Sequence, residues 1–152
     1  MIELKEYMEM VAEFHKKDGR AADRKYSCVE DFILQNGREM ELGTTEVERG
    51  EMKACFQNAY HLAMEKDWTY CEGYAIAKGL IPILHAWVLD GEGKVVDPTW
   101  EGEAEYFGCE FPWKWVMGIT FKREYWGSML DDWQNHFPLL TGEQTYPIEE
   151  VS

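Results

Sequence analysis

Apolar side chains recur with a helical period in the first half of the chain. In residues 4–17 they fall on one face, and glutamates lie on the opposite face. Residues 27–35 give a second, shorter helix that a turn-forming Asn-Gly pair ends. The longest such pattern, residues 51–66, brings Cys55 and small apolar residues to one face. We therefore expect two N-terminal helices and then a central helix that carries Cys55 near its start.

The second half of the chain changes to strand-like patterns, rich in aromatic and β-branched residues and bounded by turn signals. The expected strands cover residues 68–76, 83–89, 94–97 and 106–111. Residues 125–137 then return to a helical period, with Trp126, Met129 and Trp133 expected to face inward. Helices first and a strand meander afterwards favour an α+β fold. We expect the central helix to pack on a small antiparallel sheet, with a further helix near the C-terminus.

The length of the chain sets the domain organisation. At 152 residues it corresponds to about one ordinary domain, and we find no linker or internal repeat. The polar and acidic residues 142–152 are typical of a mobile tail. We expect a single domain over residues 1–152.

The charge balance limits the partners of the protein. The formal net charge is -14, from 29 acidic and 15 basic side chains. Such a surface repels nucleic acid phosphates and anionic membranes, and it suits a neutral or cationic substrate or a basic protein. No apolar stretch is long enough for a bilayer span or resembles a signal peptide. These patterns favour a cytoplasmic protein that binds neither nucleic acid nor membranes.

The cysteines suggest thiol chemistry rather than a disulfide framework. Cys28, Cys55, Cys71 and Cys109 form no C-x-x-C pair, and no cysteine–histidine spacing fits a zinc site. We therefore expect no metal and no cofactor. In a reducing compartment a thiol remains available as a nucleophile, which needs either a lowered pKa or a nearby base.

His85 is the candidate base, because it is a polar ring inside an apolar strand and must find a hydrogen-bond partner. The following Asp-Gly-Glu-Gly sequence at 90–93 fits a type I turn with a bulge at Gly93. In that three-residue loop Asp90 pairs with Lys94, so that His85 and Asp97 become diagonal neighbours on one face. A two-residue loop would instead turn Asp97 to the opposite face.

Four motifs occur in an order that resembles transglutaminase-like domains of the papain-like superfamily. They are Cys55-Phe56-Gln57-Asn58-Ala59, Gly73-Tyr74-Ala75, His85-Ala86-Trp87 and Asp97-Pro98-Thr99-Trp100. The resemblance covers about the middle third of the chain, and small bacterial and phage proteins show similar motif strings. It differs from the usual pattern in having Lys53 in place of glycine and Phe56 in place of tryptophan.

The resemblance implies Cys55 as nucleophile, His85 as general base and Asp97 as the group that orients the base. The expected function is that of a hydrolase or acyltransferase acting on an amide, isopeptide or thioester carbonyl. Its substrate would be a small molecule, a peptide or a protein amide. The order of the motifs also implies a transglutaminase-like fold.

Several further residues are candidates for the pocket. The oxyanion needs hydrogen-bond donors, and the Cys55 backbone N–H is the simplest. Side-chain donors and pocket residues are drawn from Gln35, Gln57, Asn58, Glu72, Trp87 and Trp100. Among the side-chain donors Gln35 ranks slightly ahead because it lies outside the central helix. Glu72 would attract an amine, and the two tryptophans would wall a cleft.

Other interpretations of the same residues stay open. Cys55 alone fits a buried small residue, His85 a core histidine, Glu72 an exposed strand residue, and tryptophans commonly fill cores. The main alternative function is a non-catalytic acidic binding or inhibitor protein that mimics nucleic acid on the same scaffold. An acyltransferase using an acyl carrier such as coenzyme A ranks last, because no basic or glycine-rich phosphate site is evident.

Overall fold

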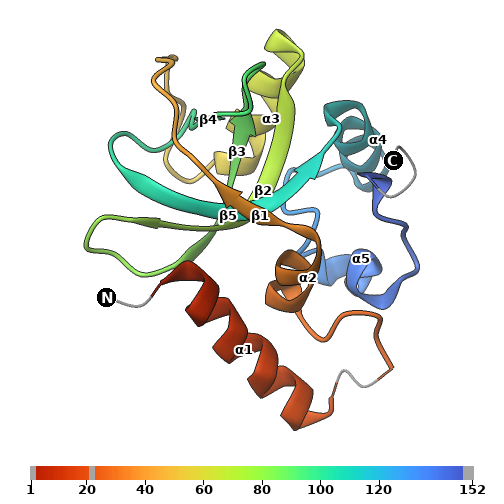
Figure 1. Ribbon diagram of the computed structural model, residues 1–152. Helices are drawn as coiled ribbons and strands as arrows, with labels where there is room; N and C mark the ends of the chain where they lie inside the picture. Colours follow the sequence, from red (N-terminus) through yellow and green to blue (C-terminus); the bar gives the residue numbers. More distant parts are fainter. Residues whose placement is uncertain (1–2, 21–22, 149–152) are drawn as a thin grey trace.

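The computed structural model describes residues 3–20 and 23–148 (Figure 1). They form an α+β fold in which helices pack around a curled antiparallel sheet. In chain order the elements are α1 (Leu4–Asp18), α2 (Val29–Asn36), β1 (Arg38–Met40), α3 (Cys55–Lys66), β2 (Thr69–Ala77), β3 (Ile83–Leu89), β4 (Val95–Val96), β5 (Ala104–Phe111), α4 (Trp113–Arg123), a 3₁₀ helix (Trp133–Asn135) and α5 (Pro138–Thr141). The α+β class expected from the sequence is confirmed.

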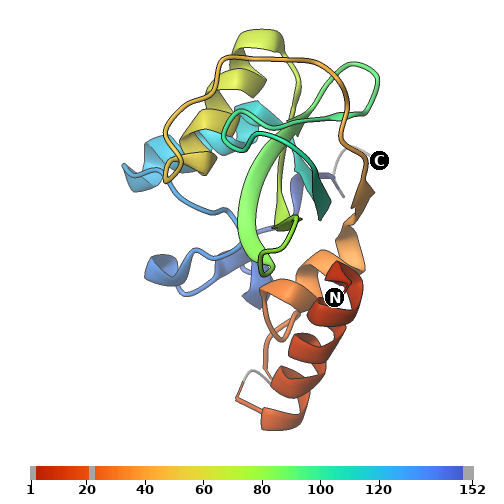
Figure 2. The same ribbon diagram turned by 90° about the vertical axis from the view of Figure 1, so that its left-hand side faces the viewer.

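The strands of the described residues follow the order β1-β5-β2-β3-β4, and every neighbouring pair is antiparallel. The sheet curls so far that the chain leaving β1 reaches β4. There the Val95 N–H donates to the Glu41 carbonyl at 2.8 Å, and the Gly43 N–H donates to the Val95 carbonyl at 2.9 Å. Figure 2 shows the segment 41–54 continuing from this contact over the end of the sheet to α3.

Both faces of β3 are buried, which explains why its sequence is a nearly continuous apolar run. Ala86 and Val88 face the larger core, into which α3 contributes Ala59 and Ala63. On the opposite face Trp87 belongs to a smaller core with residues of β2, β5 and β4. Figures 1 and 2 show α3 lying against the sheet, and α1 and α2 packed at the other end of the sheet.

Two glycines allow the central strands to approach closely. Gly73 of β2 pairs with Gly108 of β5, and a Cβ on Gly73 would collide with the backbone of β5. A Cβ on Gly108 would lie 2.7 Å from the Trp87 ring. The missing side chains therefore make room for Trp87, which is fully buried.

One expected helix is wrong. Residues 125–137 contain only the short 3₁₀ turn, and the helix lies earlier, as α4 directly after Pro112. The Arg123 side chain explains why the segment does not coil. Its guanidinium binds the backbone carbonyls of Tyr125, Gly127 and Ser128 at 2.6–3.2 Å, and this holds them away from helical partners.

Only one of the three residues expected to face inward from that segment does so. Met129 is buried, but Trp126 and Trp133 are 41% and 64% exposed. Of the tail expected to be mobile, residues 142–148 are described, and 149–152 lie outside the described residues. Tyr146 in this tail is buried against aromatic rings of α2 and β5, and its hydroxyl donates to the Glu110 carbonyl at 2.7 Å.

Candidate active site

The β3–β4 hairpin has the predicted register. The Asp90 N–H donates to the Lys94 carbonyl at 2.9 Å, and the Gly93 N–H donates to the Asp90 carbonyl at 3.0 Å. Gly93 has a φ of 78°, in the left-handed region that a bulge requires. Val88 pairs with Val96, so the same register places Asp97 diagonally opposite His85. The turn chemistry therefore fixes which face the Asp97 side chain occupies.

His85 and Asp97 form a buried hydrogen-bonded pair, with 2.9 Å between Nε2 and Oδ2. Both residues are almost inaccessible, at 2% and 4% exposed. The carboxylate accepts three further hydrogen bonds, from the Tyr106 hydroxyl at 2.7 Å and from the N–H groups of Thr99 and Trp100 at 2.9 Å each. Each oxygen of Asp97 thus has two donors, and its orientation is fixed.

These contacts also keep Asp97 ionised. Burial alone would raise the pKa of this carboxyl, but the hydrogen bond and charge of His85, helped by the Trp100 N–H and the Tyr106 hydroxyl, hold the pKa below its ordinary value. An ionised carboxylate only accepts, so Nε2 of His85 carries the proton. Its Nδ1 has no hydrogen-bond partner among the described residues and is left as the basic nitrogen.

Aromatic rings cover the imidazole. Trp100 stacks on His85 with 3.9 Å between ring centroids and 15° between planes. Tyr106 lies beyond, 6.5 Å from the imidazole centroid. Sequence reasoning missed Tyr106, because its contact with Asp97 depends on β5 returning beside β2. A tyrosine on a strand is the only local signal, and many such residues have no functional contact.

Cys55 is the first residue of α3, because the helix begins later in the chain than the expected start at residue 51. The Ala86 N–H, on the residue after His85, lies close enough to the Cys55 sulfur to lower the pKa of the thiol. The Asp90 N–H points toward β4. Because the N–H groups of every second residue in a strand point to the same neighbouring strand, the Ala86 N–H also points to the β4 side. β4 ends at Val96, and the opposite carbonyl, that of Pro98, already accepts from the Gly50 N–H. The thiol therefore occupies the place of a missing strand partner, beside the His85 backbone.

The environment of Cys55 keeps the thiol protonated. Burial raises its pKa to about 11, and the negative charges of Glu72 and Asp97 act in the same direction. The nearby Ala86 and Phe56 N–H groups lower the pKa of the thiol, but they do not outweigh the burial. At neutral pH Cys55 is a neutral thiol, and attack by its sulfur requires a base.

The candidate oxyanion donors lie in different places. The first N–H groups of a helix have no intrahelical acceptor, so the Cys55 N–H is free to bind an oxyanion. Among the described residues the Gln57 amide has no hydrogen bond, and it sits two residues along the same helix. Asn58 donates both amide hydrogens, one to the Glu51 carbonyl and one to Thr99 Oγ1 at 2.9 Å, so it links α3 to the Asp97 loop. Gln35 lies away from this cluster on α2, where it donates to Asp31.

The remaining pocket candidates also lie in different surroundings. Trp100 covers His85 and is half-buried, whereas Trp87 is fully buried and donates to the Met40 sulfur at 3.3 Å. Trp87 therefore fills core rather than walling a cleft. Glu72 is fully buried on the α3 face of the sheet. The alternative interpretation of Glu72 as an exposed strand residue is therefore wrong. Glu72 holds the Ser128 hydroxyl at 2.6 Å and the Met129 N–H at 2.7 Å.

Among residues 3–20 and 23–148 no group of three or more potential ligands is placed to bind a metal ion. No helix in these ranges has the length and apolar character needed to cross a membrane. Comparison with known proteins gave no matching family, no matching curated protein and no matching solved structure.

Proposed function

We propose that this protein is a thiol-dependent hydrolase or acyltransferase of transglutaminase-like or papain-like arrangement. Its substrate is an amide, isopeptide or thioester carbonyl of a small molecule, a peptide or a protein. The observation that carries the proposal is the buried His85–Asp97 pair at 2.9 Å, next in the chain to Ala86, whose N–H acts on the Cys55 thiol. A nucleophile, a base and a group that orients the base are the parts this chemistry needs.

The reaction begins with proton transfer. Nδ1 of His85 takes the thiol proton as the Cys55 sulfur attacks the carbonyl carbon, and the developing imidazolium is stabilised by the Asp97 carboxylate. The oxyanion accepts hydrogen bonds from the Cys55 N–H and the Gln57 amide. His85 then returns the proton to the leaving amine or thiol, which leaves a thioester on Cys55.

The second half of the reaction uses the same groups. Water or an amine attacks the thioester, His85 removes its proton, and the sulfur leaves and is reprotonated by His85. Because the pKa of Cys55 is about 11 in the free protein, His85 acts as a general base during attack. A thiolate–imidazolium pair does not have to exist beforehand.

The surroundings of the site fit a neutral or cationic substrate and a reducing compartment. The net charge of -14 disfavours nucleic acids and anionic membranes as partners. All four cysteines are free thiols, which is the state that the cytoplasm maintains.

Intact-mass analysis after exposure to p-nitrophenyl acetate and a small alkyl thioester tests the proposal. We expect one acetyl or acyl group per chain, carried on Cys55 and absent from Cys55→Ala. His85→Ala should keep its fold by circular dichroism and lose acylation by about 10²–10⁴-fold, because the general base is missing. Cys28→Ala is the matched control, since it removes another thiol and should be acylated like the parent.

Acylation that persists in Cys55→Ala, or that is unchanged in His85→Ala, would contradict the proposal. Complete absence of acylation at Cys55 with all probes would favour the second candidate, a non-catalytic acidic binding protein. The observation behind that candidate is a groove of about 1000 Å³ where the end of β1, the end of β2 and the start of β5 meet. Glu3, Glu39, Glu41, Glu103 and Glu105 line it together with the single base Lys78.

A further inference from the structure

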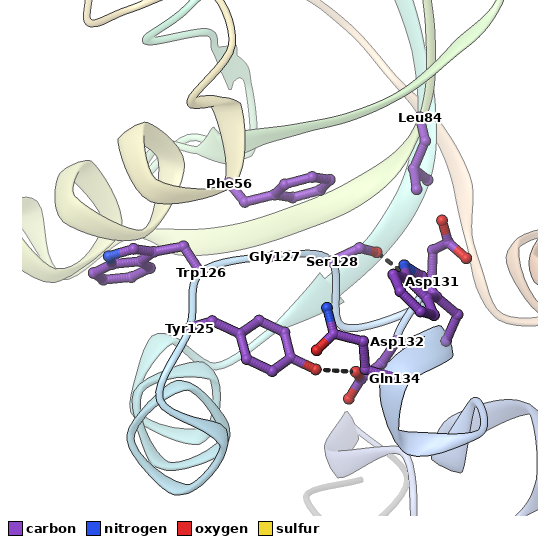
Figure 3. A pocket seen from close by; sticks show the side chains of 10 residues that line it. Phe56, Leu84, Tyr125, Trp126, Gly127, Ser128, Asp131, Asp132 and Gln134 are labelled. Atoms are coloured by element: carbon purple, nitrogen blue, oxygen red, sulfur yellow. Dashed lines mark hydrogen bonds between the residues drawn. The ribbon is translucent and has the colours of Figure 1, made fainter.

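A separate cavity of about 220 Å³ is lined by sequence neighbours of Cys55 and His85 (Figure 3). Phe56, the residue after Cys55, and Leu84, the residue before His85, form one wall. The segment 125–134 forms the other, and Figure 3 shows its backbone at Gly127 passing beneath the Phe56 ring. The cavity is too small for a typical drug-sized ligand, and its volume suits one amino-acid side chain.

The segment 125–134 is firmly attached to the sheet. Glu72 anchors it through the Ser128 hydroxyl and the N–H groups of Met129 and Leu130, at 2.6–3.3 Å. Ser128 Oγ in turn accepts the Asp131 N–H at 2.9 Å. The wall of the cavity is therefore preformed.

The cavity carries one uncompensated negative charge. Asp132 is buried and neutralised, because the Arg123 guanidinium lies 3.2 Å away and Tyr125 donates to it at 2.6 Å. Asp131 differs. Among the described residues its carboxylate has no hydrogen bond and no ion pair, and no lysine or arginine lines the cavity. Burial raises the pKa of Asp131, and the nearby charges of Glu30 and Asp132 raise it further.

Two exposed tryptophans line the same cavity as this carboxylate. Trp126 is 41% exposed and is held against Tyr60 and His61, with ring centroids 5.1 and 5.2 Å apart. Trp133 is 64% exposed and lines the same cavity. Indole faces attract cations, and aromatic and apolar walls accommodate an alkyl stem.

We propose that this cavity binds the basic side chain of an arginine or lysine in the substrate. The alkyl stem lies between Phe56, Leu84 and the indoles, and the cationic group pairs with Asp131. The charge of Asp131 interacts with Glu30 and Tyr74. The carboxylates whose charges raise the pKa of Cys55 are different ones, Glu72 and Asp97. The cation therefore binds away from the thiol and anchors the molecule whose carbonyl reacts. The assignment as a substrate residue rests on the proposed function, but the binding itself does not.

Binding to the Cys55→Ala protein tests this without any turnover. The probe is N-acetyl-arginine amide, and the neutral comparison is N-acetyl-citrulline amide, which has nearly the same shape. NMR of the indole N–H groups reports binding, with the Trp126 and Trp133 signals assigned from Trp126→Phe and Trp133→Phe. We expect the arginine probe to shift both signals and the citrulline probe to shift neither.

Asp131→Asn should weaken the arginine affinity by about fivefold, the loss expected for one partly exposed charge pair. Glu92→Gln in the β3–β4 turn removes the same charge far from the cavity and should leave the affinity unchanged. Equal shifts from both probes, or an Asp131→Asn protein that binds as tightly as its parent, would overturn the inference. If Cys55 cannot be acylated while the arginine probe still binds, the proposed function fails and this inference stands.

Discussion

Glu72 and Asp97 are two buried carboxylates on opposite faces of the same sheet, and both influence Cys55. Asp97 is held in its charged form, with a pKa below the ordinary value. Glu72 is completely buried, and that burial raises its pKa although the Ser128 and Tyr70 hydroxyls and the Met129 N–H bind it. The difference lies in their partners, because Asp97 bonds to an imidazole that can become positive and Glu72 meets only neutral donors.

The comparison assigns the two carboxylates different tasks. Asp97 can respond to the charge on His85, so it belongs to the proposed chemistry. Glu72 connects the sheet to the segment that walls the cavity, so its task is to hold structure in place. Substitutions at the two positions should therefore affect different measurements.

The largest expected effect is that of Asp97→Asn on acylation. The amide can donate to Nε2 and so favour the wrong tautomer of His85, which should lower the acylation rate by about 10⁴-fold. Acylation followed by intact mass measures this, and circular dichroism checks the fold. Glu105→Gln on the exposed side of β5 is the charge-matched control. A rate within tenfold of the parent would show that Asp97 does not orient a catalytic base.

Glu72→Ala should have the second largest effect, on stability. It leaves the Tyr70 and Ser128 hydroxyls and the Met129 N–H without their buried acceptor, at a cost of about 3–5 kcal/mol. Glu72→Gln keeps one acceptor oxygen and should cost about 1–2 kcal/mol. Urea unfolding measures both, again with Glu105→Gln as control. If Glu72→Ala were as stable as the control, the anchoring task would be disproved.

The smallest expected effect is on the pH dependence of stability, where the two carboxylates should act in opposite directions. Asp97, with its lowered pKa, contributes stability above about pH 4 that is lost as pH falls through its folded pKa. Glu72, with its raised pKa, contributes stability below about pH 4 that is lost as pH rises through its folded pKa.

Urea unfolding from pH 3 to 8 separates the two contributions. The stability advantage of the parent over Asp97→Asn should grow between about pH 3 and 5. Its advantage over Glu72→Gln should shrink above about pH 4. Two differences that change with pH in the same direction would contradict the assignment.

The sequence predicts the local parts of this arrangement well. The Asp90–Gly93 turn sets the hairpin register, and that register brings His85 to Asp97 without reference to the rest of the chain. The prediction that Cys55 lies near the start of its helix is also confirmed, although the helix begins after residue 51. These features depend on residues near each other in sequence, where turn and helix rules apply.

The features that the sequence did not reveal depend on distant contacts. Tyr106 reaches Asp97 because β5 pairs with β2, and Glu72 is buried because residues 128–130 fold over it. The helix predicted at 125–137 fails for the same reason, since Arg123 binds the carbonyls that a helix would have used. Hydrophobic periodicity carries no information about such partners.

The edge of the sheet at β4 is covered by contacts within the molecule. Strands at sheet edges tend to recruit strands from neighbouring molecules, which leads to aggregation. Here β4 already bonds to the segment that follows β1, and the thiol takes the Ala86 N–H that the early end of β4 leaves free. The group proposed to perform chemistry thus also compensates for a backbone donor that this short edge strand leaves without a partner.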